Sequence, residues 1–233
     1  MIRLIPALAG IALLYAGTAD ARPAKPRPAP VARKTDTPPA DTTITPSADE
    51  LRVADWIATS GDNQNLPYAI VDKNIAALFL YDADGNALAQ VPVLIGIALG
   101  DDATPGVGTK DLSELGPAEK TTPAGRFLAK FGMAAGGARV LWVDYADSVA
   151  MHPIPGDAAK SEKRRDRMLS PTPEDNRITF GCINVPLAFY GKILRPLFLG
   201  KGGYVYVLPD TKPLEDVFPR LRVHALTYNG APS

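Results

Sequence analysis

The sequence predicts a mainly β domain with a few short helices, and three observations support this fold class. Short runs of β-branched and aromatic residues recur along residues 48–233. Turn-forming stretches of glycine, asparagine and aspartate separate these runs. Helical periodicity is confined to short segments. A domain of about 185 residues is long enough to enclose one sizeable core.

The predicted elements follow one another along this domain. Ser47 is placed to cap a short helix that ends at Gly61–Asn63. A turn at Asp82–Asn86 joins two β-rich runs into a hairpin. Pro186 can begin a later helix, which Gly200–Gly203 ends. The expected strands are residues 68–71, 75–81, 88–97, 128–131, 140–145, 148–151 and 204–208.

Two segments precede the domain. Residues 1–21 combine a positive start, a short apolar stretch and a small-x-small triplet, which predicts a cleavable signal peptide. The alternative is an uncleaved membrane anchor, which the short apolar stretch disfavours. Residues 22–47 are rich in proline, alanine and threonine, and we expect a disordered linker because they bury too little apolar surface. The mature protein is therefore expected in the periplasm or otherwise outside the cytoplasmic membrane.

Charge is balanced over the whole chain, with 25 basic and 25 acidic residues. No overall positive field is present to attract a polyanion. We therefore expect no nucleic-acid partner and, after signal cleavage, no stable membrane insertion.

Cys182 is the only cysteine, so it cannot form an internal disulfide. In an exported protein an unpaired cysteine indicates a reactive thiol, an intermolecular bridge or a small buried residue. His152 lies 30 residues upstream, at a predicted strand end. Because an imidazole is the usual base for a thiol nucleophile, the pair predicts acyl transfer. The alternative for His152 is a structural role.

Three motifs carry a family resemblance. They are the hairpin turn at Tyr81–Gly85, the run Thr122–Phe127 with the pattern Thr-Pro-x-Gly-x-Phe, and Gly181–Asn184 with His152 upstream. Together they resemble the L,D-transpeptidase catalytic domain, a family of bacterial cell-wall cysteine transferases. The resemblance spans roughly residues 67–210. It implies an L,D-transpeptidase-like β-sandwich, no metal or organic cofactor, and peptidoglycan peptide stems as substrate.

Two features depart from the family pattern. The family usually has a second histidine directly before Gly-Cys, whereas this chain keeps Thr179 but has Phe180, which forms no side-chain hydrogen bond. The stretch from His152 to Thr179 is also longer than the family norm. The surplus, residues 156–175, contains the basic run Lys160–Arg167. This run is either a solvated surface or a lid that binds a substrate carboxylate.

Acyl-transfer chemistry and the resemblance together assign roles to the motif residues. Cys182 would form a thioester while His152 takes the thiol proton and returns it to the leaving amine. The Cys182 backbone N–H, with a neighbouring one freed by Gly181, is the expected oxyanion donor. Asn184 either caps the following helix or lies beside the substrate. One cysteine and two histidines fit no zinc pattern. The oxyanion or substrate-binding candidates are Gly181, Thr179, Asn184 and Arg177.

The resulting hypothesis is an exported L,D-transpeptidase-like acyltransferase that contributes to cell-wall biogenesis and cell shape. As the family implies, Cys182 would attack the third residue of a tetrapeptide stem and expel the terminal D-alanine. The acyl group would then pass to an amine on a neighbouring stem or an attached protein. Two alternatives stay open. One is a peptidoglycan amidase or carboxypeptidase that uses water as acceptor, and the other is a non-catalytic wall-binding protein of the same fold.

Overall fold

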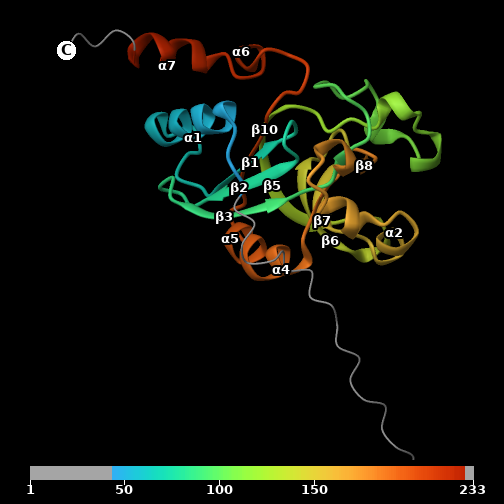
Figure 1. The fold of residues 1–233 in the computed structure, drawn as a ribbon. Helices are drawn as coiled ribbons and strands as arrows, with labels where there is room; N and C mark the ends of the chain where they lie inside the picture. Colours follow the sequence, from blue (N-terminus) through green and yellow to red (C-terminus); the bar gives the residue numbers. More distant parts are fainter. Residues whose placement is uncertain (1–43, 229–233) are drawn as a thin grey trace, which may run out of the picture. The chain divides into compact units, whose positions relative to one another are not determined.

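The computed structural model describes residues 44–228, which belong to one compact unit of the chain, Thr35–Ser233. The signal peptide expected at residues 1–21 and residues 22–43 of the linker expected at residues 22–47 lie outside the described residues. The predicted mainly β fold with a few short helices is confirmed (Figure 1). Among residues 44–228, no helix is both long enough and apolar enough to cross a membrane.

Eight strands of the described chain form one mixed sheet, and two short strands pair beside it. The strands are β1 (Tyr68–Asp72), β2 (Ala77–Tyr81), β3 (Ala87–Pro92), β4 (Ile95–Gly96), β5 (Gly125–Met133), β6 (Arg139–Asp144), β7 (Val149–Pro153), β8 (Arg177–Thr179), β9 (Ile183–Val185) and β10 (Gly203–Val207). The order across the sheet is β3-β2-β1-β10-β5-β6-β7-β9. Neighbours run antiparallel except β1 with β10 and β7 with β9. The separate pair, β4 with β8, is parallel.

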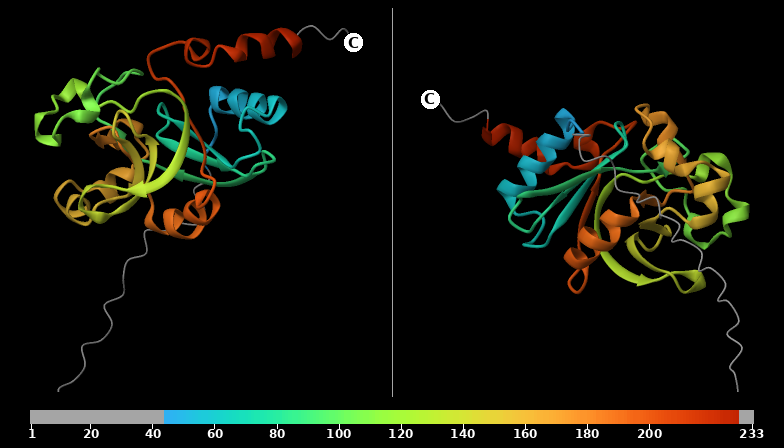
Figure 2. Two further views of the ribbon diagram at one scale, coloured as in Figure 1. Left: turned by 180° about the vertical axis from the view of Figure 1, so that it is seen from behind. Right: turned by 60° about the horizontal axis from the view of Figure 1, so that its bottom comes forward.

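Helices flank the sheet on several sides (Figure 2). In the described part of the chain the longest are α1 (Ala48–Ser60) and α7 (Arg220–Tyr228), which lie side by side. A continuous helical segment after Pro186 comprises α4 (Leu187–Phe189), the π-helical turn η6 (Tyr190–Leu194) and α5 (Arg195–Phe198). The remaining helices are α2 (Gly156–Ser161), α3 (Arg164–Met168) and α6 (Leu214–Val217), with 3-10 turns η1 (Val107–Thr109), η2 (Leu112–Glu114), η3 (Pro117–Glu119), η4 (Ala135–Gly137) and η5 (Pro173–Asn176).

Most predicted elements are confirmed, with differences in extent. The predicted hairpin corresponds to β2 and β3, which pair antiparallel. The prediction of one strand over residues 88–97 is wrong in length, because β3 ends at Pro92, which has no N–H to donate to a ladder, and β4 follows separately. The strands β8 and β9 are not among the predicted elements, since three residues give no readable periodicity. The C-terminal helices α6 and α7 are likewise additional.

Helix α1 begins and ends where the sequence predicts. The Ser47 side chain caps it by accepting a hydrogen bond from the Glu50 N–H at 3.0 Å. At the other end Gly61 adopts a left-handed conformation, with φ 67°, and its N–H donates to Ile57 O at 2.9 Å. The buried face of the helix, which includes Trp56, packs on the sheet. Helix α1 therefore extends the packed domain upstream of residue 67.

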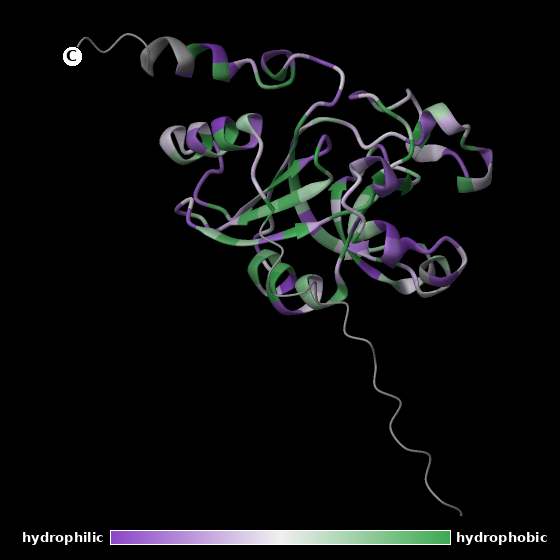
Figure 3. Cartoon of the chain, in the orientation of Figure 1, coloured by the Kyte–Doolittle hydropathy of each residue, from purple (hydrophilic) through white to green (hydrophobic). Residues whose placement is uncertain are grey.

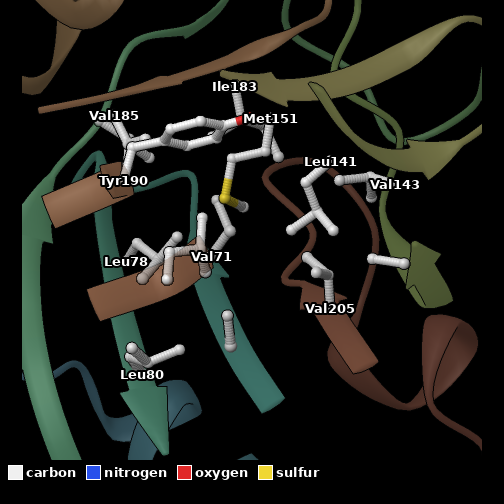
Figure 4. Close-up of a cluster of buried hydrophobic side chains, with 14 of the residues drawn as sticks. Val71, Leu78, Leu80, Leu141, Val143, Met151, Ile183, Val185, Tyr190 and Val205 are labelled. Atoms are coloured by element: carbon white, nitrogen blue, oxygen red, sulfur yellow. The ribbon is translucent and has the colours of Figure 1, made fainter. Parts of the chain in front are cut away.

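Two hydrophobic clusters lie on opposite faces of β1, β2 and β10. Because side chains alternate along a strand, Val71 belongs to the first cluster and Ile70 to the second. The first cluster also contains Leu141 of β6 and Met151 of β7, so it joins side chains of these strands to those of β1, β2 and β10 (Figure 4). The second cluster packs beneath α1, α6 and α7. Apolar residues accordingly concentrate on the strands (Figure 3).

Thr122, which is only 1% exposed, joins two backbone segments beside the β4–β8 pair. Its hydroxyl accepts from the Gly96 N–H and donates to Gly181 O, both at 2.8 Å. A Cβ on Gly96 would lie 2.4 Å from Lys120 O, and one on Gly181 would lie 2.7 Å from Thr121 O. Both glycines therefore permit a close backbone approach that the Thr122 hydroxyl fixes.

Replacing Thr122 by valine should lower the free energy of unfolding by about 2 to 4 kcal/mol, because two buried backbone groups lose their partner. Urea denaturation measures this change. The Thr122→Ser variant keeps the hydroxyl and should lose only the contribution of one methyl group, about 1 kcal/mol. Equal stability of the valine and serine variants would contradict the bridging role.

Candidate active site

The pairing of β7 with β9 brings His152 and Cys182 to one face of the sheet. In this pairing Met151 lies opposite Ile183 and His152 opposite Asn184. Met151 and Ile183 point into the first cluster and are fully buried. Because side chains alternate, His152 and Asn184 point to the other face. Cys182, two residues before Asn184, continues the same row.

A tight turn positions Cys182 directly before β9. The Thr179 hydroxyl donates to Cys182 O at 2.6 Å and accepts from the Gly181 N–H at 3.2 Å. Gly181 has φ 120°, a conformation that residues with a side chain rarely adopt. The Gly181 N–H is thus committed to Thr179, and the second oxyanion donor expected beside Cys182 stays a prediction. The Cys182 N–H remains the proposed donor.

A pocket of about 360 Å³ lies on this face, within the usual size range of small-ligand sites. Its polar lining comprises Arg139, Ser148, His152 and Cys182. Most of its wall is apolar and is formed by Ala134, Ala138, Val140, Trp142, Ala150, Pro153 and Pro155. The predicted nucleophile and the predicted base therefore share one largely apolar pocket.

Hydrogen bonding determines which nitrogen of His152 can act as a base. Nδ1 lies 2.8 Å from Pro153 O. Because a carbonyl oxygen only accepts, Nδ1 carries the hydrogen and Nε2 keeps its lone pair. Burial lowers the pKa of His152; the hydrogen bond to Pro153 opposes this shift, and the positive charge of Arg164 adds to it. The ring is therefore neutral at neutral pH.

The Cys182 thiol is half-buried and donates weakly to Ser148 O at 3.8 Å. Burial raises the pKa of the thiol, while a hydrogen bond with the Ala150 backbone and the charge of Arg164 oppose the shift. The thiol is therefore protonated at neutral pH. Within residues 44–228 no hydrogen bond joins the thiol directly to the His152 ring. The pair is a neutral thiol and a neutral imidazole that line one pocket.

Arg177 lies in a buried ionic network and not in the pocket wall. Its Nη2 donates to Asp210 Oδ2 at 2.6 Å. The Lys73 ammonium lies 2.7 Å from Asp101 Oδ1 and 3.4 Å from Asp210 Oδ1. Two cations thus share Asp210, so Arg177 takes part in this ionic network. Its predicted contact with substrate stays a prediction.

Asn184 does not cap the helix that follows it, and its predicted place beside the substrate stays a prediction. The helix that follows is capped at Pro186 and has no side-chain cap. Asn184 is fully buried. Its Oδ1 accepts from Arg164 Nη1 at 2.8 Å, and its Nδ2 lies 3.5 Å from His152 Nε2. Asn184 therefore connects an arginine to the predicted base.

Phe180 stands outside the pocket lining. It is 38% exposed, and the Lys120 ammonium lies 4.0 Å from the centroid of its ring. This is a cation–π contact. Phe180 therefore contacts a loop lysine, while Ser148, His152 and Arg139 supply the polar groups around Cys182.

Arg164 is the site residue that sequence reasoning missed. The basic segment at residues 156–175 forms α2, α3 and η5. Arg164 is only 6% exposed, whereas the flanking Lys163 and Arg165 are exposed. Nothing in the run of charges distinguishes the one arginine that folds inward. Within residues 44–228 no group of three or more histidine, cysteine or acidic side chains is placed to hold a metal ion.

Comparisons with known proteins find partial likeness to solved structures. No protein-family model matches the chain, and no curated protein matches it significantly. The chain is similar to an L,D-transpeptidase from Mycobacterium smegmatis, with 14% identity, coverage of 60% of this chain and 58% of that one, and a TM-score of 0.34. It is also similar to the helical cell shape determining protein Pgp2 from Campylobacter jejuni, with 16% identity, coverage of 68% of this chain and 56% of that one, and a TM-score of 0.42. A third similar structure is the catalytic domain of an E. faecium L,D-transpeptidase, with 19% identity, coverage of 60% of this chain and 95% of that one, and a TM-score of 0.32.

These likenesses concern part of the fold. The chain spans less than two thirds of the length of the Mycobacterium smegmatis and Campylobacter jejuni proteins. All three TM-scores and identities are low. Chemistry at the site must therefore be judged from its own residues.

The neutral state of both site residues predicts their titration. His152 should titrate below the ordinary histidine value of about 6.5, and Cys182 above the ordinary cysteine value of about 8.5. Thiolate formation, and with it alkylation by iodoacetamide, should therefore rise only at alkaline pH. NMR of the ring and the pH dependence of alkylation measure the two values. In urea both should return to their ordinary values. A depressed cysteine pKa with a raised histidine pKa would instead indicate a preformed ion pair.

Proposed function

We propose that the protein is an exported cysteine acyltransferase that acts on peptidoglycan peptide stems through a thioester at Cys182. One observation supports this most strongly: the single cysteine and His152 line the same pocket, although 30 residues separate them in the sequence. The substrate class is supported by the resemblance of the motifs to the L,D-transpeptidase catalytic domain. Two residues of these motifs, Thr122 and Gly181, are hydrogen-bonded to each other. Export is supported by the signal-peptide pattern of residues 1–21.

The reaction begins from the neutral pair. The thiol turns from Ser148 O toward His152 Nε2, which accepts its proton as the sulfur attacks the peptide carbonyl. The Cys182 N–H stabilises the oxyanion. When the tetrahedral intermediate collapses, the C–N bond breaks and His152 returns the proton to the leaving amine. An incoming amine then gives its proton to Nε2 as it attacks the thioester carbonyl. The C–S bond breaks, and Nε2 returns the proton to the leaving sulfur, which restores the neutral thiol and imidazole.

The pocket also favours an amine over water as the acceptor of the acyl group. Its wall is mainly apolar, and an apolar wall limits the number of ordered waters near a thioester. The Pro153 carbonyl holds the ring so that Nε2 can serve both half-reactions. Arg139 places a positive charge at the pocket, suited to the carboxylate of a peptide stem.

Purified protein incubated with a tetrapeptide stem or a carbapenem should acquire one covalent adduct at Cys182, detected by mass spectrometry. Cys182→Ser should acquire no thioester. His152→Asn should slow adduct formation about 100-fold or more, because the general base is lost. His224→Asn changes the only other histidine, which pairs with Asp55 on α1, and is the matched control with an unchanged rate. Absence of any adduct on Cys182 would remove the proposed function.

The identity of the acceptor is tested with purified cell wall. Incubation should produce cross-linked stems, together with free D-alanine, if an amine is the acceptor. Trimmed stems without new cross-links would instead identify water as the acceptor and the protein as a carboxypeptidase or amidase. Intact wall function in cells that carry Cys182→Ser would favour a non-catalytic wall-binding protein.

A further inference from the structure

We propose that Arg164, acting through Asn184, is a positioning residue that fixes the ring tautomer of His152 and keeps the ring uncharged. This inference rests on the proposed function for its catalytic meaning, but the interactions themselves belong to the described structure. Arg164 comes from the basic segment that lengthens the chain between His152 and Thr179. The segment would thereby supply a part of the active site and would not be only a solvated surface.

The first step is the orientation of the Asn184 amide. A guanidinium only donates hydrogen bonds, so the amide atom 2.8 Å from Arg164 Nη1 is the oxygen Oδ1. The amide nitrogen Nδ2 is therefore directed toward His152, 3.5 Å from Nε2. Without Arg164 the buried amide could flip and present its oxygen to the ring, which would favour a hydrogen on Nε2.

The second step concerns the ring itself. An amide nitrogen only donates, so Nε2 must accept, and on the opposite side Pro153 O requires a hydrogen on Nδ1. The two neighbours thus favour the same neutral tautomer. At 3.5 Å the contact with Asn184 is weak, so the thiol proton of Cys182 can replace it during attack.

The third step is electrostatic. Arg164 is 6% exposed and Asn184 is fully buried, so solvent screens the charge only weakly. Glu162 Oε2 accepts from Arg164 Nε at 2.6 Å and neutralises part of that charge. The side chain of Glu162 is 39% exposed, so its own charge is better screened by solvent. The other ionisable groups of the site are Cys182 and Arg139. A net positive field at the ring opposes imidazolium formation and keeps Nε2 available.

The positive charge of Arg164 shifts the pKa values of His152 and Cys182 in the same direction. It disfavours the imidazolium of His152 and favours the thiolate of Cys182, so it lowers the pKa of each group. Removal of Arg164 should therefore raise both values together. A purely structural role would leave no reason for the two titrations to move in the same direction.

The test uses the full-length protein and Arg164→Met, which keeps an unbranched side chain without charge or donors. Ring ¹⁵N shifts should show Nδ1–H in the wild type and a mixed tautomer in the variant, and both pKa values should rise. Acylation at neutral pH should fall about 10- to 100-fold, as expected when a catalytic group is misplaced. Arg164→Lys restores the charge and should recover part of the pKa effect.

Two further variants keep the proposal falsifiable. Lys160→Met removes one charge from an exposed position of the same segment and should match the wild type in every readout. Asn184→Asp replaces the amide donor by an acceptor, so Nε2 should become protonated and the ring pKa should rise strongly. Thermal unfolding verifies that each variant is folded. Wild-type ring shifts and titration in folded Arg164→Met, or equal shifts in Lys160→Met, would overturn the proposal.

The ring measurements need no substrate, which separates this proposal from the proposed function. If Cys182 forms no adduct but the ring responds to Arg164 as expected, the function fails and the positioning interaction stands. If adducts form and the ring is unaffected, the positioning role fails alone.

Discussion

The Thr122 hydroxyl holds together the two segments on which the candidate site depends. By accepting from the Gly96 N–H and donating to Gly181 O, it fixes the loop before Cys182 against the edge strand β4. Gly181 can then adopt a backbone conformation that places Cys182 directly before β9. Two motifs that lie 59 residues apart in the sequence are thus one structural unit. The side chain of Cys182 is directed outward as a consequence.

The sheet converts this local geometry into a pocket. Parallel pairing of β7 with β9 sets His152 and Cys182 in the same outward row, while Met151 and Ile183 anchor the opposite face in the core. A rigid core behind both strands keeps the two side chains at a fixed relative position. The largely apolar wall of the pocket desolvates both groups and so favours their neutral forms.

The segment between β7 and β8 adds a layer that the sheet does not provide. It covers Asn184 and brings the buried guanidinium of Arg164 to the side chain that faces His152. The buried charge is tolerable because Glu162 and Asn184 both accept hydrogen bonds from it. This segment therefore places a buried positive charge close to the site without contributing a residue to the pocket lining.

The sequence by itself determined the mainly β class, the cap of α1 at Ser47, the hairpin of β2 and β3, and the pair Cys182 and His152 as candidates. Each of these depends on local pattern or on the scarcity of a residue type, which a single chain displays. Only the tertiary structure decided that Arg177 joins an ionic network, that Asn184 is buried, and that one arginine of a basic run turns inward. These outcomes depend on which strands pair and on what covers them. Such contacts join residues far apart in the chain, so no local pattern encodes them.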